Sequence, residues 1–347
     1  MARTPSFDAQ FEKTKAAGRI VEELCARLAQ SVEAAQPSSS DAALEADAAL
    51  LGKILDAKNT FAADSRRVIQ GLSARIDAAY LAFDRADDVT RKERILGFFT
   101  RKPRNSFRAS RQRRLAVAES VQVILAQAAV VYRVLEGCKE TSAPFVTQCE
   151  ARLEASMEAR RKVVLSIDDA RQRDRELAAT VATLERRIST STDDTQFDRW
   201  SADRDDAAGR RDAVLAERKA LNDERDVLDR QAILFGDMID ALNDGVSIYS
   251  LLLNAVSIEA ERCIMLHDVA YGSSQPLLED LRLFSQAGDD MEHPPRPGPF
   301  HHLLTLHAKG AVTMQDVDRR KIRLEDALAR HFERSEAKMI ETGAGKT

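Results

Sequence analysis

Apolar residues recur along most of this chain at spacings of three and four, which is the pattern of one face of an α-helix. Residues 7–35 carry such a face at Ile20, Val21, Leu24 and Leu28. A second helix is predicted from about 41 to 85, because the same rhythm returns there. Its apolar positions are Leu44, Leu51, Ile54, Leu55, Ile69, Leu72, Ile76, Tyr80 and Phe83. The polar stretch 37–40 separates the two helices, and Ser40 or Asp41 is a suitable N-cap for the second.

The chain is most apolar from Leu115 to Leu135, which predicts a helix buried on several sides. Gly137 and Pro144 then predict a kink or a short break. Residues 145–188 are densely charged and carry only a thin apolar seam, typical of a coiled coil rather than a globule. The seam positions are Val146, Cys149, Leu153, Met157, Val164, Ile167, Leu177, Val181, Leu184 and Ile188.

The pattern is mirrored about a polar turn at 189–196. After the turn a sparse seam runs from Phe197 to Leu228, and dense apolar positions follow from Ile233 to Leu266. Asn243, Asp244 and Gly245 predict a weak point in this last helix. The mirror arrangement predicts an elongated antiparallel hairpin of helices with a slim tip and an apolar base. We expect a second copy of the chain to cover that base, giving a homodimer.

The C-terminal part is predicted to be a separate helical appendage. A proline-rich linker spans 288–299, and a helix is expected from about 313 to 341, where Thr313 and Asp316 form a near capping box. The predicted organisation is therefore an N-terminal helix at 1–36, a coiled-coil domain at 41–287, the linker, and the appendage at 300–347. The appendage either packs back on the bundle or binds a protein partner.

Composition supports the all-α prediction and gives no sign of an enzyme. Charged residues make up 31% of the chain and aromatic residues 5%, as in long helices and coiled coils. The C-terminal sequence 343–347 resembles a phosphate-binding loop, but no glycine stands where its first glycine should be, so that interpretation fails. We expect no catalytic residue, no cofactor and no metal site, since the histidines at 301, 302 and 307 lack partners at ligand spacing. We also expect His267 to be a core or interface residue and His331 to lie on the surface.

The remaining composition signals predict a cytoplasmic protein. The four cysteines are far apart in sequence, which favours small apolar core residues in a reducing compartment. The N-terminus has no apolar stretch of signal-peptide length, and no run of apolar residues approaches the length of a membrane span.

The most unusual stretch is the basic segment, Arg91 to Arg114. It holds ten Lys or Arg residues and one acid, a local charge of +9 in a chain whose net charge is −4. Cations interleaved with phenylalanines suit the headgroup region of an anionic membrane. Our candidate lipid-binding residues are Arg101, Lys102, Arg104, Arg108, Arg111, Arg113, Arg114, Phe98 and Phe99. A basic linker whose aromatic residues pack on a neighbouring helix, or a nucleic-acid-binding segment, would produce the same pattern.

The stretch from Leu251 to Leu281 resembles the end of the last helix in arfaptin-like members of the BAR and arfaptin-homology (AH) superfamily. The resemblance lies in an apolar, His-containing face followed by a tyrosine and a Gln/Leu/Glu-rich end. The positions that carry it are His267, Tyr271, Gln275, Leu278 and Glu279. The basic segment is similar to the insert of endophilin-type members. The resemblance covers about residues 41–285, whereas the helix before Pro37 and the chain beyond 288 have no counterpart in a minimal BAR domain.

This resemblance implies a peripheral membrane protein that acts as a homodimer, binds anionic lipid and senses or shapes membrane curvature. Secondary candidates for lipid contact are Arg160, Arg161, Lys162, Arg186, Arg187, Arg210 and Arg211, although the same residues fit i,i+4 ion pairs on a solvated helix face. The alternative is a coiled-coil scaffold of the cytoskeleton or an organelle that contacts proteins and no lipid. Nucleic acid is the less favoured partner, because most of the chain is acidic.

Overall fold

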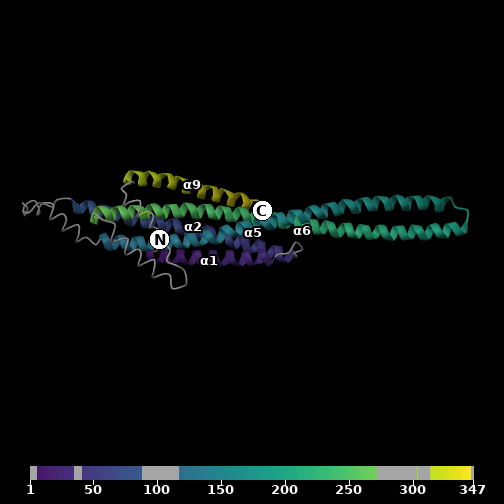
Figure 1. The fold of residues 1–347 in the computed structure, drawn as a ribbon, viewed down its shortest axis with the longest axis horizontal. Helices are drawn as coiled ribbons and strands as arrows, with labels where there is room; N and C mark the ends of the chain where they lie inside the picture. The colour runs from purple at the N-terminus through teal and green to yellow at the C-terminus, as the bar shows by residue number, and fades with distance from the viewer. Residues whose placement is uncertain (1–5, 35–40, 88–116, 272–302, 304–312, 345–347) are drawn as a thin grey trace, which may run out of the picture. The chain divides into compact units, whose positions relative to one another are not determined.

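The computed structural model describes residues 6–34, 41–87, 117–271, 303 and 313–344. These residues form five α-helices and no β-strand, which confirms the all-α prediction (Figure 1). The helices are α1 (Phe7–Ala34), α2 (Asp41–Asp87), α5 (Val117–Thr190), α6 (Asp194–Tyr271) and α9 (Met314–Ala344). The basic segment, the expected helix at 275–286 and the linker at 288–299 lie outside the described residues.

The helices divide into two compact units. The first unit contains α1 up to Cys25, α2 from Ile54, α5 up to Ala143, α6 from Asp244, and α9. The second contains the end of α1, the start of α2, α5 from Pro144 and α6 up to Asn243. In α5 and α6 the unit boundaries therefore fall at Pro144 and at the Asn243–Asp244 pair, where the sequence predicts interruptions.

Neither expected interruption ends a helix. Pro144 lies inside α5, which runs through it without a break. Asp244 and Gly245 lie inside α6, where Asp244 receives an ion pair of 2.5 Å from Lys58 of α2. A Cβ atom at position 245 would lie 3.3 Å from the Lys58 side chain. Glycine therefore lets the lysine approach the helix closely, which is a packing role rather than a helix-ending one.

The first unit buries the apolar base of the sequence pattern within one chain. Its largest fully buried side chains come from three helices: Phe61, Leu72, Ile76, Leu125, Leu135, Tyr249, Ile248 and Leu252. The rings of Phe61 and Tyr249 lie 5.8 Å apart in a tilted arrangement. Each such side chain contributes about 1.5–3 kcal/mol when buried. The apolar base thus needs no second copy to cover it, and the homodimer stays a prediction that requires another surface.

The second unit contains an antiparallel hairpin of α5 and α6. Arg173 pairs with Glu217 at 2.9 Å, and Arg160 pairs with Asp229, so residues further along α5 meet residues earlier in α6. Between the two helices, Val163, Ile167 and Leu228 form a small apolar cluster. Residues 191–193 make the turn, where the Asp193 carboxylate caps α6 by accepting a hydrogen bond of 3.0 Å from the Thr195 N–H.

Two helices, Ser120–Thr190 and Asp194–Asp268, contain an 18-residue window apolar enough to cross a membrane. The share of that window buried within the structure is 39% in the first helix and 50% in the second. This test is passed equally by the core helices of a water-soluble protein, so the expectation that no segment spans a membrane stays a prediction.

Candidate functional site

The residues with the strongest sequence signal cannot be placed. All nine candidate lipid-binding residues lie outside the described residues: Phe98, Phe99, Arg101, Lys102, Arg104, Arg108, Arg111, Arg113 and Arg114. The basic segment joins the end of α2 to the start of α5, and both of these helix ends belong to the first unit.

Most of the secondary candidates for lipid contact on the hairpin form ion pairs with carboxylates. Arg210 pairs with Asp206 at 2.7 Å, and Lys162 lies 3.9 Å from Glu158, both at i,i+4 spacing. Arg160 pairs with Asp229, and Arg211 pairs with Asp174 at 2.9 Å, both across the two helices. Arg161, Arg186 and Arg187 form no ion pair among the described residues. The hairpin surface is therefore a mixed-charge surface and not a continuous basic one.

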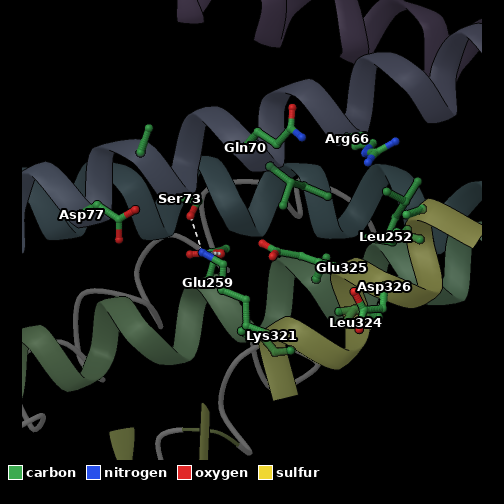
Figure 2. Close-up of a pocket in the computed structure, with 16 residues that line it drawn as sticks. Arg66, Gln70, Ser73, Asp77, Leu252, Glu259, Lys321, Leu324, Glu325 and Asp326 are labelled. Carbon is green, nitrogen blue, oxygen red and sulfur yellow. Dashed lines mark hydrogen bonds and ion pairs between the residues drawn. The ribbon is translucent and has the colours of Figure 1, made fainter. Parts of the chain in front are cut away.

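The first unit holds a groove of about 540 Å³ between α2, α6 and α9 (Figure 2). Its apolar wall includes Ile69 and Leu252, and its polar wall includes Ser73, Glu259 and Lys321. Figure 2 shows Ser73, Glu259 and Lys321 converging from the three helices. These residues belong to a cluster of charged side chains.

The charge cluster is built where α6 places three charged residues in its most apolar stretch. The side chains of Glu259 and Glu261 are only 4% and 2% exposed. Helix α9 neutralises both: Lys321 pairs with Glu259 at 2.9 Å, and Arg320 pairs with Glu261 at 2.7 Å. Lys321 also donates a hydrogen bond of 2.5 Å to the Ser73 hydroxyl. Since buried carboxylates without partners are costly, these two contacts fix where α9 packs.

Arg262 connects the cluster to α2. Its guanidinium lies 2.8 Å from Glu259, 2.5 Å from Asp77 and 3.9 Å from Asp318. Burial opposes its charge, but the Glu259 and Asp77 carboxylates hold the pKa of Arg262 above its ordinary value. Every charge in the cluster faces an opposite one. Such an arrangement holds the three helices together.

Tyr80 of α2 contacts both α6 and the start of α9 beside the charge cluster. Its hydroxyl donates a hydrogen bond of 3.1 Å to the Arg262 carbonyl and lies 3.7 Å from the Met314 sulfur at the start of α9. Burial raises the pKa of Tyr80 well above its usual value, so the phenol keeps its proton.

Sequence reasoning missed this cluster, although the sequence carries a signal for it. Glu259, Glu261 and Arg262 interrupt an otherwise apolar run, and charges in such a run are buried and paired more often than solvated. His331, expected on the surface, instead lies partly buried at 3.6 Å from Asp244. The expectation for His267 is confirmed, since only 3% of it is exposed. The described residues hold no group of three side chains suited to a metal ion.

A second surface lies within the hairpin. Four residues of α5, Val146, Leu153, Met157 and Val164, form an apolar row that the sequence assigns to the seam with α6. The structure contradicts part of that assignment. The buried seam is Cys149, Ser156, Val163 and Ile167, whereas Met157 is 58% exposed. We call the row of Val146, Leu153, Met157 and Val164 the α5 stripe.

The chain was compared with protein-family models, with curated protein sequences and with solved structures, and none of the three comparisons finds a match.

Proposed function

We propose that this protein acts by binding rather than by catalysis, as a peripheral membrane module that contacts anionic lipid through its basic segment, residues 91–114. The observation that carries the proposal is the concentration of charge. The segment contributes +9 to a chain of net charge −4 and combines that charge with Phe98 and Phe99. Each cation held near an anionic membrane contributes about 1 kcal/mol, so the segment acts as a group.

The pairing of charges elsewhere supports the basic segment as the contact. In the hairpin, Arg160, Arg173, Arg210, Arg211 and Arg218 each meet a carboxylate. Solvent-exposed pairs of this kind have little net field to offer an anionic surface. This argues for lipid contact next to the apolar first unit instead of along the hairpin. The BAR-like character, curvature sensing and cytoplasmic location belong to the same proposal.

Vesicle co-sedimentation tests lipid contact directly. The full chain is mixed with vesicles of phosphatidylcholine alone or with added phosphatidylserine, at low and high salt. We expect binding that requires phosphatidylserine and weakens as salt rises. A variant with Arg101, Arg104 and Arg108 changed to Glu should lose more than about 100-fold in membrane partitioning, since three charges are reversed.

A matched variant controls for charge alone. Changing Arg171, Arg175 and Arg199 to Glu reverses the same number of charges on exposed positions of α5 and α6 that are not candidates for lipid contact. We expect this variant to bind vesicles within about threefold of the natural chain. Equal binding by the basic-segment variant and the natural chain would refute the proposal. An electrophoretic shift with nucleic acid at physiological salt, without vesicle binding, would instead support the hypothesis that the segment binds nucleic acid.

The second candidate function is a coiled-coil scaffold that contacts proteins and no lipid. The specific observation that favours it is the exposed α5 stripe, because an apolar row at helical spacing is a common surface for helix-to-helix association. Absence of vesicle binding, together with recovery of one stoichiometric protein that no longer binds after Met157→Glu, would favour this function over the first.

A further inference from the structure

Helix α5 of the second unit carries two rows of mostly apolar residues, and only one of them is fully buried. One row is buried and consists of Cys149, Ser156, Val163 and Ile167, of which Val163 and Ile167 form a cluster with Leu228 of α6. The α5 stripe runs beside it with a spacing of seven, four and seven. Met157 is 58% exposed, and Val146, Leu153 and Val164 are partly buried. Three stripe residues, Leu153, Met157 and Val164, line a shallow hollow whose lining also includes Glu150 and Arg160.

Glu150 and Arg160 complete a heptad register within the stripe. The positions 146, 150, 153, 157, 160 and 164 alternate by four and three, which is the spacing of the core positions of a coiled coil. The six residues read Val, Glu, Leu, Met, Arg, Val. One acidic and one basic residue therefore stand symmetrically about an apolar centre, with a valine at each end.

We propose that residues 146–164 of α5 form an antiparallel, two-fold symmetric seam with the same residues of a second copy of this chain. In the antiparallel register, Leu153 faces Met157 of the second copy, Glu150 faces Arg160, and Val146 faces Val164. By symmetry each of these layers occurs twice. The seam therefore has two apolar central layers, two ion-pair layers and two valine layers, with every residue matched to a complementary one.

Charge selects this partner and this orientation. A parallel seam would set Glu150 against Glu150 and Arg160 against Arg160, which places like charges opposite each other. Glu150 forms no ion pair among the described residues, so it is available to a partner. Arg160 already pairs with Asp229, and the seam places its guanidinium between two carboxylates. Both members of that existing pair are more than one third exposed, which leaves Arg160 open to the second contact.

The sequence pattern predicts that two copies associate through the apolar base. The seam provides a different surface for that association. Most of the base is buried within one chain, although Val123 and Ile233 stay exposed, so little of it is left for a second copy to cover. A seam of 19 residues is about 28 Å long. An interface of that length is small, and we expect a dissociation constant in about the micromolar range. The inference concerns protein alone and does not depend on lipid binding.

Sedimentation equilibrium of the full chain without lipid tests the proposal. The natural chain should dimerise reversibly with concentration. Met157→Glu puts a carboxylate into both central layers and should raise the dissociation constant on the order of 100-fold. Ile322→Glu is the control: Ile322 is 60% exposed on α9 and does not line the hollow, so the dimer of this variant should match that of the natural chain.

A charge-exchange experiment tests the orientation. Glu150→Arg alone sets two basic side chains against each other in both ion-pair layers, so this variant by itself should be monomeric. Arg160→Glu alone sets two acidic side chains against each other there and should be monomeric for the same reason. Mixed together, the two variants restore both ion-pair layers and should form a mixed dimer. The cost of an acidic side chain at position 160 beside Asp229 is the same alone and in the mixture, so the comparison isolates the seam.

Three results would overturn the proposal. The first is a natural chain that stays monomeric at every concentration, since the stripe must then be covered by something else. The second is a dimer that Met157→Glu does not weaken, which would place the contact elsewhere. The third is failure of the mixed charge variants to associate while the natural chain does, which would rule out the antiparallel register. Circular dichroism confirms that each variant remains helical.

Discussion

Gly18 occupies a position in α1 where no larger residue fits. A Cβ atom there would collide with Cγ1 of Val134 in α5 and would lie 3.1 Å from the ring of Phe61 in α2. We therefore predict that Gly18→Ala destabilises the chain by about 1–3 kcal/mol, although alanine is the better helix former. Gly209→Ala in α6 is the control, because nothing lies within 4 Å of its Cβ. That change should raise the free energy of unfolding, measured in urea, by about 0.5–1 kcal/mol. Changes of the same sign in the two variants would contradict the packing argument.

Four free cysteines, Cys25, Cys138, Cys149 and Cys263, are buried, which confirms the prediction that they are small core residues. Burial raises the pKa of Cys25 from 9.0 to about 11 and of Cys149 from 9.0 to about 12. Because the thiolate is the reactive form, we predict that Cys25 reacts with a disulfide reagent at pH 8 about 100-fold more slowly than a free thiol. All four should react at once in denaturant; rapid reaction in the folded state would show that these thiols are accessible.

The raised pKa of Cys25 also makes the unfolding free energy depend on pH. The pKa of Cys25 is higher in the folded state than in the unfolded one, so the folded state binds the proton more tightly. Its contribution is fully present below pH 9.0 and is lost as pH rises from there toward about 11. Unfolding free energy measured against pH should therefore fall across that window. The Cys25→Ala variant should show a shallower fall.

At the scale of elements, α9 is held to the first unit mainly by its cations. Only Val317 and Leu328 of its described residues are buried apolar side chains, and Ile322 is 60% exposed. We predict that Arg320→Ala with Lys321→Ala leaves Glu259 and Glu261 short of counter-charge and weakens α9 docking by about 2–4 kcal/mol. Amide hydrogen exchange in 314–332 should then speed up strongly.

The control for α9 is a pair of cations on the same helix that face solvent. Arg319→Ala with Arg323→Ala removes the same total charge, but both positions are exposed. Exchange of α9 should then be within about threefold of the natural chain. Equal protection of α9 in both double variants would mean that its apolar contacts alone hold it in place.

Element bounds follow closely from the sequence, and element contacts do not. The helices expected at 7–35, 41–85 and 313–341 are observed within a few residues, and the capping box is confirmed, with the Thr313 hydroxyl 2.5 Å from the Asp316 carboxylate. Caps and apolar rhythm are local, which is why they can be read directly. In α5, by contrast, Ser156 and Val163 are buried, whereas Leu153 is only partly buried and Met157 is exposed. Two apolar rows one position apart fit the same heptad rhythm, and only the partner helix decides between them.

Candidate sites were harder to predict than helices, for a different physical reason. The α2–α6–α9 charge cluster joins residues from positions 73–80, 259–262 and 314–321, and no local pattern reports that they meet. The prediction that hairpin cations are paired is confirmed for Lys162 and Arg210 at i,i+4 spacing. Arg160 and Arg211 find their carboxylates across the hairpin instead, a contact that requires knowledge of the antiparallel register.

At the scale of the whole molecule, the two units differ in how much apolar surface each buries. The first unit encloses large side chains such as Leu72, Leu125 and Leu252 completely, whereas residues 176–212 bury only Leu184 and Ala207 among their apolar side chains. Local opening requires little free energy where few apolar contacts are lost. Within one helix, the amides should therefore differ in their protection from hydrogen exchange.

Hydrogen exchange across α5 and α6 measures this difference within single helices. We predict that amides in 176–187 and 196–212 exchange at least about tenfold faster than those in 121–135 and 248–264, although all four stretches are helical. Self-association through residues 146–164 should slow exchange at that seam with increasing concentration and leave 176–212 unchanged. Concentration-dependent protection that instead reaches residues 176–212 would place the contact between copies nearer the turn at 191–193, where the seam register of Glu150 and Arg160 has no role.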